Sequence, residues 1–155
     1  MNGVLVDANV ILDIFLNDPH WADWSESVLT EHANKTTLFI NGIIYSEISI
    51  GFNKIEEVES ALQKGGFQIL EIPKEALFLA DKAYLTYRKN SGIKKSPLPD
   101  FYIGAQAAVL DLRLITRDIS RYRTYFPTVR LICPDEYNIS RGTFPAGESE
   151  HSWMK

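Results

Sequence analysis

A three-residue apolar run that ends in an aspartate opens the chain and constrains its fold most strongly. Val4, Leu5 and Val6 lead directly into Asp7, and a helical pattern follows from Ala8. The run is too short for a helix and predicts a buried strand. If this strand is central and parallel, Asp7 lies at its carboxyl end, where open parallel sheets bind their ligands.

Short apolar segments continue to alternate with helical patterns along the chain. Further strands are predicted at residues 37–40, 67–72, 112–116 and 129–132, and helices at residues 19–34, 43–52, 55–64, 74–89 and 100–110 and within 117–126. Such alternation is typical of right-handed βαβ units. We therefore expect an α/β fold of three layers (α/β/α), with a central, mainly parallel sheet of about five strands.

Length and composition predict one globular domain. The chain has 155 residues, of which 45% are hydrophobic and 23% are charged. A chain of this length buries enough surface for a core without disulfides or metals as staples. We expect residues 1–137 to form the domain. Residues 138–155 are polar and rich in Gly and Ser, and we expect them to form a tail outside the core.

Other features limit the location and the partners. No apolar run is long enough to span a bilayer and no signal peptide is visible, so we expect no membrane association. The single cysteine, Cys133, fits a reducing compartment, which favours a cytoplasmic location. The net charge of −4 argues against affinity for nucleic acid through bulk charge, but it leaves room for a local basic rim.

Four acidic residues occupy positions that favour convergence at one rim of the sheet. Glu47 borders the apolar stripe of its helix, and Asp100 extends the packing face of another. Asp118 follows the fourth predicted strand, at the same edge of the sheet as Asp7. Asn9 and Asp13 share one helix face, because they are four residues apart, and they could add oxygen ligands at the same place. The further oxygen ligands would therefore be supplied by two polar side chains, those of Asn9 and Asp13.

Each acid also has an ordinary structural explanation. Asp100 and Asp118 could cap the helices that begin beside them. Glu47 could be a surface residue, Asp7 could bond a nearby backbone amide, and Asp13 could be a solvated helix residue. As a set, however, four clustered carboxylates repel one another, and either raised pKa values or a bound cation must relieve the repulsion.

All-oxygen ligation suits Mg²⁺ or Mn²⁺. The histidines, His20, His32 and His151, lie outside these motifs, so a zinc site is not expected. Two hard cations about 4 Å apart can activate water for displacement at phosphorus. That chemistry needs neither a Ser-His-Asp arrangement nor a phosphate-binding loop, and the sequence shows neither.

Basic and aromatic residues flank the predicted acidic rim. Four basic side chains are candidates to hold substrate phosphates: Arg117, Arg121, Lys94 and Lys95. Three tyrosines are candidates to stack on nucleic-acid bases: Tyr102, Tyr122 and Tyr125. For any single one of these residues, a solvated charge or a core aromatic is the simpler interpretation, and Arg117 is the strongest candidate for an exception.

Four motifs, taken together and in order, resemble those of a PIN domain. They are residues 5–13 (LVDANVILD), Glu47 within residues 45–48 (YSEI), residues 99–107 (PDFYIGAQA) and residues 114–118 (LITRD). More narrowly, they resemble the VapC toxins of bacterial toxin–antitoxin pairs. The resemblance covers roughly residues 3 to 133.

This resemblance implies a Mg²⁺- or Mn²⁺-dependent endoribonuclease. The metal-binding acids of the family fall on Asp7, Glu47, Asp100 and Asp118, and its supporting polar positions fall on Asn9 and Thr116. The resemblance also implies a homodimer and inhibition by a small VapB-type antitoxin that inserts a segment at the acidic site. The chain after Tyr137 departs from the compact family pattern.

Two other functions remain open from the sequence. A haloacid-dehalogenase-like phosphatase also begins with an apolar strand that ends in an aspartate, and Asp7 would be its nucleophile. Such enzymes normally carry a second acid two residues later, where this chain has Asn9. A non-catalytic, RNA-binding or scaffolding protein of the PIN fold is the other alternative, although a complete acid set argues against it.

Overall fold

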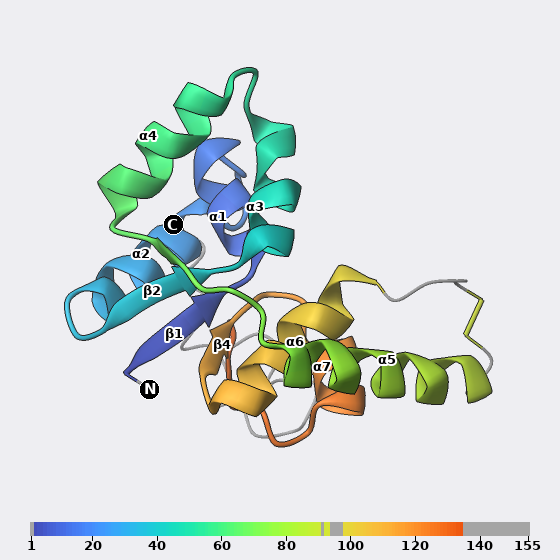
Figure 1. Ribbon diagram of the computed structural model, residues 1–155. Coiled ribbons are helices and arrows are strands. Elements are labelled where there is room, and N and C mark those ends of the chain that lie inside the picture. Colours follow the sequence, from blue (N-terminus) through green and yellow to red (C-terminus); the bar gives the residue numbers. More distant parts are fainter. Residues whose placement is uncertain (1, 91, 94–97, 135–155) are drawn as a thin grey trace.

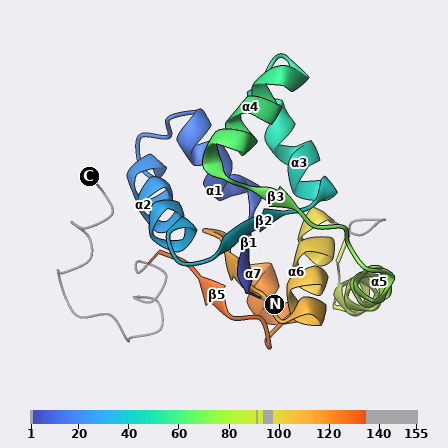
Figure 2. The same cartoon turned by 60° about the vertical axis from the view of Figure 1, so that its left-hand side comes forward.

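A parallel sheet forms the centre of the molecule in the computed structural model, which describes residues 2–90, 92–93 and 98–134. Over these residues the sheet has five strands, all paired in parallel, in the order β3-β2-β1-β4-β5 (Figures 1 and 2). The strands are β1 (Gly3–Val6), β2 (Thr37–Ile40), β3 (Gln68–Ile69), β4 (Arg113–Ile115) and β5 (Leu131–Ile132). The predicted α/β architecture is therefore confirmed.

Helices cover both faces of this sheet. Helices α1, α2 and α4 lie on one side, and α5, α6 and α7 lie on the other (Figures 1 and 2). Helix α3 packs against both α1 and α6, so it bridges the two layers. The helices are α1 (Ala8–Phe15), α2 (Ala22–Ala33), α3 (Gly42–Ile48), the 3₁₀ turn η1 (Ser49–Gly51), α4 (Ile55–Gly65), α5 (Lys74–Lys89), α6 (Pro99–Leu110) and α7 (Ser120–Tyr125).

Strand β1 lies between β2 and β4 and is the most buried part of the sheet. Leu5 pairs with Phe39 on one side and with Leu114 on the other. The side chains of Val4, Leu5 and Val6 have no exposed surface, which explains their uninterrupted apolar character. The strand therefore delivers Asp7 to the carboxyl edge at the middle of the sheet.

Polar residues that follow two of the strands begin the next helices. The side chain of Asp7 accepts a hydrogen bond from the backbone amide of Ala8 at the start of α1. The side chain of Asn41, which follows β2, accepts one from the backbone amide of Ile44 and caps α3. Both caps lie at the same edge of the sheet.

The main differences from the predicted elements occur at the two edge strands and at one helix end. Strands β3 and β5 are shorter than predicted, because each pairs on one side only and the chain then leaves the sheet. The predicted helix at residues 43–52 ends as an α-helix at Ile48 and continues as η1. The predicted tail, residues 138–155, lies outside the described residues.

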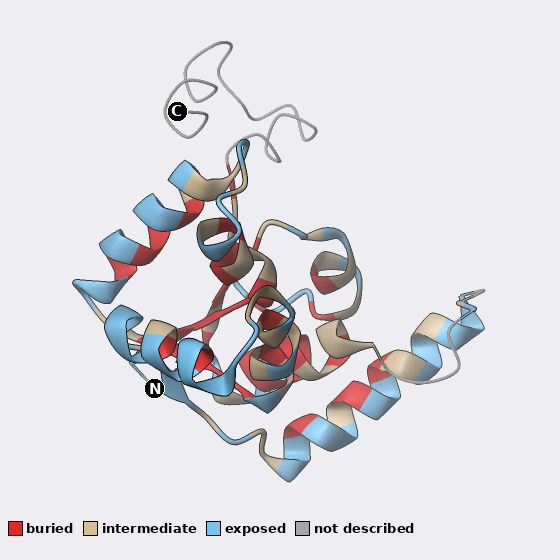
Figure 3. Cartoon of the chain, turned by 90° about the horizontal axis from the view of Figure 1, so that it is seen from above, coloured by how far each residue is buried: buried red, intermediate tan, exposed pale blue. Residues whose placement is uncertain are grey.

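Burial separates the two sides of the outer helices. Figure 3 shows buried residues along one side of α4 and of α5, with exposed residues on the other side. The buried residues are Val58 and Leu62 in α4 and Ala76, Ala80 and Ala83 in α5. In the part of the chain that the structure describes, no helix has the length and apolar character needed to cross a membrane.

A buried amide chain ties α3 to α6. The Nδ2 atom of Asn41 donates to Oε1 of Gln106 at 2.7 Å, and Nε2 of Gln106 donates to the carbonyl oxygen of Glu71 at 3.1 Å. Asn41 and Gln106 have no exposed surface. Because Asn41 also caps α3, these hydrogen bonds fix the position of the helix that carries Glu47.

We predict that Gln106→Leu lowers the free energy of unfolding by about 1–3 kcal/mol, because the Asn41 amide and the Glu71 carbonyl lose their buried partner. Urea denaturation measures the change. Val109→Ala is the matched control, since Val109 lies on the same helix and is 39% exposed. Equal stability of the two variants would contradict a structural role for the amide chain.

Candidate functional site

Three protein donors hold the buried carboxylate of Asp7. Its Oδ1 atom accepts from the amide of Ala8 at 2.8 Å, while Oδ2 accepts from the hydroxyls of Thr116 and Tyr122, both at 2.8 Å. The residue is 5% exposed. The donors come from α1, from the end of β4 and from α7, so this carboxylate joins three elements of the fold.

Asn9 and Thr116 brace the loop that carries Asp118. Nδ2 of Asn9 lies 3.4 Å from Oγ1 of Thr116, and Oδ1 of Asn9 accepts from the amide of Arg117 at 3.3 Å. The amide of Asp118 donates to Oγ1 of Thr116 at 3.1 Å. These contacts hold the end of β4 against the start of α1, beside Asp7.

Asp100 and Glu47 approach the same region from α6 and α3. Oδ2 of Asp100 forms an ion pair with Nη1 of Arg121 at 3.1 Å, and its Oδ1 lies 3.5 Å from the hydroxyl of Tyr122. Glu47 is partly buried, and its Oε1 atom is buried without a hydrogen-bond partner. An orphaned carboxylate oxygen of this kind is uncommon in folded proteins and requires an explanation.

The helix-cap explanations for two of the acids are wrong. Leu98 occupies the cap position of α6 and Ile119 that of α7, and neither helix has a side-chain cap. Asp100 lies inside the first turn of α6, whereas Asp118 precedes α7 and is exposed. Neither carboxylate is thus used to begin its helix.

Burial and mutual repulsion raise the pKa values of three of the acids. Desolvation raises the pKa of Asp7 to about 6, although the hydrogen bonds from Thr116 and Tyr122 lower it in part. Desolvation and then the charges of Asp7 and Asp100 raise the pKa of Glu47 to about 7. The pKa of Asp100 is raised chiefly by desolvation, although Arg121 opposes this, and the charge of Asp118 contributes. The four acids therefore interact electrostatically in one region.

The chemistry of this region fits a hard divalent cation, although the side chains are not already arranged as a metal site. Over the described residues, no group of three or more His, Cys, Asp or Glu side chains is arranged so that it could hold a metal ion. Protein donors hold Asp7 and Asp100 instead. However, the donor set consists of oxygen atoms alone and includes the orphaned Oε1 of Glu47, and burial raises the pKa values of Asp7, Glu47 and Asp100.

Asp13 does not join the acids at the sheet edge. Its carboxylate is 3% exposed and receives Nε of Arg117 at 2.6 Å, Nη2 of Arg117 at 2.8 Å and the hydroxyl of Ser25 at 2.8 Å. The guanidinium of Arg117 also lies over the ring of Trp21. The expected oxygen ligand and the expected phosphate-binding arginine thus form an ion pair with each other. This geometry does not support a metal-directed role for Asp13 or substrate binding by Arg117.

Of the other predicted substrate-binding residues, Arg121 lies at the acidic region, whereas the two lysines, Lys94 and Lys95, lie outside the described residues. Arg121 is paired with Asp100 and stacked near the rings of Tyr87 and Phe101.

Tyr122, which the sequence offered as a base-stacking residue, is 1% exposed and cannot stack on a ligand. Burial raises the pKa of Tyr122 well above its usual range, so its hydroxyl stays protonated and donates to Asp7. Sequence reasoning missed this role, because a tyrosine at helical spacing carries no sign of a carboxylate partner. It also missed Ser25, whose hydroxyl donates to Asp13.

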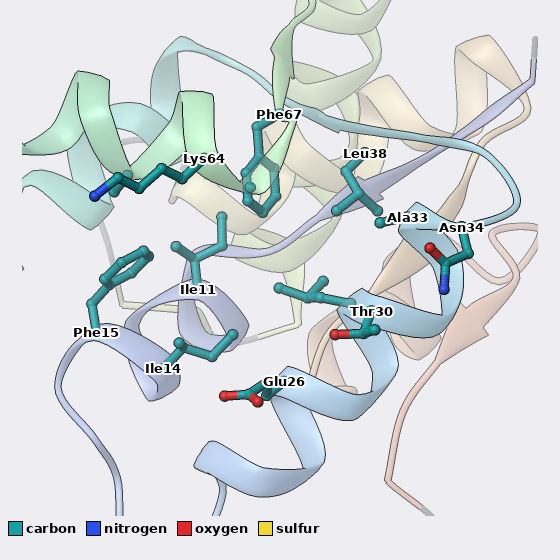
Figure 4. A pocket seen from close by; sticks show the side chains of 13 residues that line it. Ile11, Ile14, Phe15, Glu26, Thr30, Ala33, Asn34, Leu38, Lys64 and Phe67 are labelled. Carbon is teal, nitrogen blue, oxygen red and sulfur yellow. The ribbon is translucent and has the colours of Figure 1, made fainter.

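An apolar pocket lies on the opposite face of α1. It has a volume of about 370 Å³ and is lined mainly by apolar side chains from α1, α2, β2 and the end of α4. Figure 4 shows Ile11, Ile14, Phe15 and Phe67 around it, with Lys64 and Glu26 at its border. Helix α1 therefore presents Asn9 to the acidic region and apolar side chains to this pocket.

Comparison with known families and structures places these features in context. A family model described as PIN domain matches residues 4–127. No curated protein matches the sequence significantly.

The structure of VapBC2 from Rickettsia felis, bound to a DNA fragment, is similar with a TM-score of 0.66 at 18% identity, covering 84% of this chain and 98% of that chain. VapBC-1 from nontypeable Haemophilus influenzae gives 0.63 at 18% identity, covering 84% and 97%. FitAcB from Neisseria gonorrhoeae gives 0.58 at 20% identity, covering 83% and 96%. At these identities the likeness concerns the fold.

We predict that, in EDTA, protonation of Asp7 and Glu47 stabilises the folded chain. Their folded pKa values, about 6 and about 7, exceed the unfolded values of 3.8 and 4.5. Their contribution is therefore complete below about pH 4 and is lost as the pH rises through 6 to 7. For Asp7 alone, the shift from 3.8 to about 6 corresponds to a loss on the order of 3 kcal/mol.

Urea denaturation between pH 4 and pH 8 measures this effect as a difference between variants. Asp7→Asn and Glu47→Gln should each flatten the decline in stability at rising pH. Asp81→Asn, at an exposed position of α5, is the control and should follow the wild type. Parallel profiles for all four proteins would show that the two acids are not desolvated.

Proposed function

Because the chain belongs to the PIN domain family, we propose that it is a metal-dependent endoribonuclease that hydrolyses RNA phosphodiester bonds. The observation that carries the proposal is that desolvated carboxylates from the end of β1, from α3 and from α6 interact in one region, and that one of them has a buried oxygen without a partner. Burying several carboxylates together destabilises the fold unless a bound group neutralises their charge. A divalent cation would neutralise it.

In this proposal, Asp7, Glu47, Asp100 and Asp118 hold one or two Mg²⁺ or Mn²⁺ ions. When bound, such ions supply an activated water and neutralise charge that develops on the phosphate. Asn9 and Thr116 hold the Asp118 loop in place through the hydrogen bonds described above. No side-chain nucleophile is required, which agrees with a region built from carboxylates, amides and hydroxyls.

Substrate phosphates would be met by basic residues around the acids. The side chain of Arg121 is 33% exposed beside Asp100, so its charge lies where a phosphate must approach. Lys94 and Lys95 precede α6 in the sequence and remain candidates for the same role. The choice of RNA as substrate rests on the resemblance of the motifs to VapC toxins.

We further propose that the chain is the toxin of a VapBC-type pair, with a VapB-type antitoxin as its partner, that it forms a homodimer, and that it acts in the cytoplasm. The similar structures from Rickettsia felis and Haemophilus influenzae are VapBC complexes, which supports this partner class. The single cysteine, Cys133, is compatible with a reducing compartment.

The geometry disfavours a phosphatase in which Asp7 is the nucleophile. Both oxygens of Asp7 accept hydrogen bonds from protein donors, and the residue is 5% exposed. An attacking carboxylate oxygen needs a clear path to phosphorus. Mass spectrometry after incubation with a phosphate ester tests this alternative, because it would show a phosphorylated Asp7.

We predict that Asp7→Asn reduces Mg²⁺- or Mn²⁺-dependent cleavage of single-stranded RNA by at least 100-fold while the fold is retained, since the variant lacks the central charge of the site. Gel-based cleavage assays with EDTA-treated protein and added metal measure the rate, and circular dichroism checks the fold. Asp81→Asn should cleave as the wild type does. Undiminished cleavage by Asp7→Asn would remove Asp7 from the mechanism, and RNA binding without cleavage by the wild type would favour a non-catalytic function.

A further inference from the structure

We propose that Tyr122 is a positioning residue that orients the carboxylates of Asp7 and Asp100 for a divalent cation. This inference rests on the proposed function, because it concerns the same site. Tyr122 is not acidic, lies on α7 and is separate from the four acids, and its hydroxyl contacts Asp7 at 2.8 Å and approaches Asp100 at 3.5 Å.

The hydroxyl of Tyr122 has one hydrogen, and the distances assign it to Asp7. An O–H···O distance of 2.8 Å is normal, whereas 3.5 Å is too long for a strong bond. Tyr122 therefore fixes the orientation of Asp7, and the same hydroxyl oxygen keeps a longer contact with Oδ1 of Asp100. Thr116 shares the task, since its hydroxyl donates to the same Oδ2 atom of Asp7.

The setting of Tyr122 makes its hydroxyl an accurately placed group. The side chain is 1% exposed, so the ring cannot move without disturbing the core. Phe126, which directly follows α7, anchors this end of the helix, because its ring contacts Phe101 and lies close to Gly104. A hydroxyl on a ring held in this way directs a neighbouring carboxylate more firmly than a water molecule would.

Loss of this hydroxyl should act on metal affinity. In Tyr122→Phe, Oδ2 of Asp7 keeps one donor instead of two, and Oδ1 of Asp100 loses its contact with the hydroxyl. Partners that orient metal-binding side chains typically contribute 10- to 100-fold to metal affinity. We expect the dissociation constant for Mn²⁺ to rise about tenfold.

The test is a Mn²⁺ titration of the full chain by calorimetry, together with the Mn²⁺-dependent shift of the thermal unfolding midpoint. Each variant is compared with its own EDTA-treated form, so a general loss of stability cancels. Tyr125→Phe is the matched control: Tyr125 lies on the same helix, and its ring packs against the rings of Tyr87 and Phe101.

Weaker Mn²⁺ binding by Tyr122→Phe, with Tyr125→Phe equal to the wild type, supports the proposal. Unchanged or tighter Mn²⁺ binding by Tyr122→Phe overturns it and leaves the proposed nuclease function intact. A wild type that binds Mn²⁺ no better than Asp7→Asn overturns the proposed function and this inference with it. None of these results depends on RNA cleavage.

Discussion

The fold depends on a carboxylate buried at the end of its central strand. Asp7 follows a strand without exposed surface, and it is itself almost completely buried. Removing a carboxylate from water is costly, and protein hydrogen bonds offset only part of that cost. Three donors, from α1, the end of β4 and α7, converge on Asp7. The charge thus dictates how these elements meet.

A second buried charge, Asp13, secures the same junction from one helical turn further along α1. Asn9 binds the backbone of Arg117, and Asp13 binds its guanidinium, so α1 holds this residue at two positions four residues apart. Because Arg117 lies between Thr116 and Asp118, this attachment also fixes the loop that carries the outermost acid. The sequence predicted Asp13 as an oxygen ligand and Arg117 as a phosphate-binding residue. Their ion pair instead holds the loop that carries Asp118.

The sequence predicted the helices and strands well, but it did not predict which side chains contact one another. The helix at residues 74–89 and the strand at residues 37–40 agree with their predicted bounds, because periodicity and length decide such segments. Edge strands were predicted too long, since apolar character does not reveal how many neighbours a strand has. Arg117 lies 104 residues from its partner Asp13 along the chain, and Tyr122 lies 115 residues from its partner Asp7, so no local pattern could identify these pairs.

The four acids differ in burial, and this difference matches what each would have to do around a cation. Asp7 is buried and braced by protein, Asp100 and Glu47 are partly buried, and Asp118 is exposed. A ligand braced by several donors cannot move far, whereas an exposed one can adjust as an ion or a phosphate arrives. In the proposed function, an ion or a phosphate would therefore arrive from the side of Asp118 and Arg121, where a positive guanidinium already neutralises part of the charge of Asp100. The deepest acid would set the position of the ion, and the outer acids would complete its coordination together with substrate.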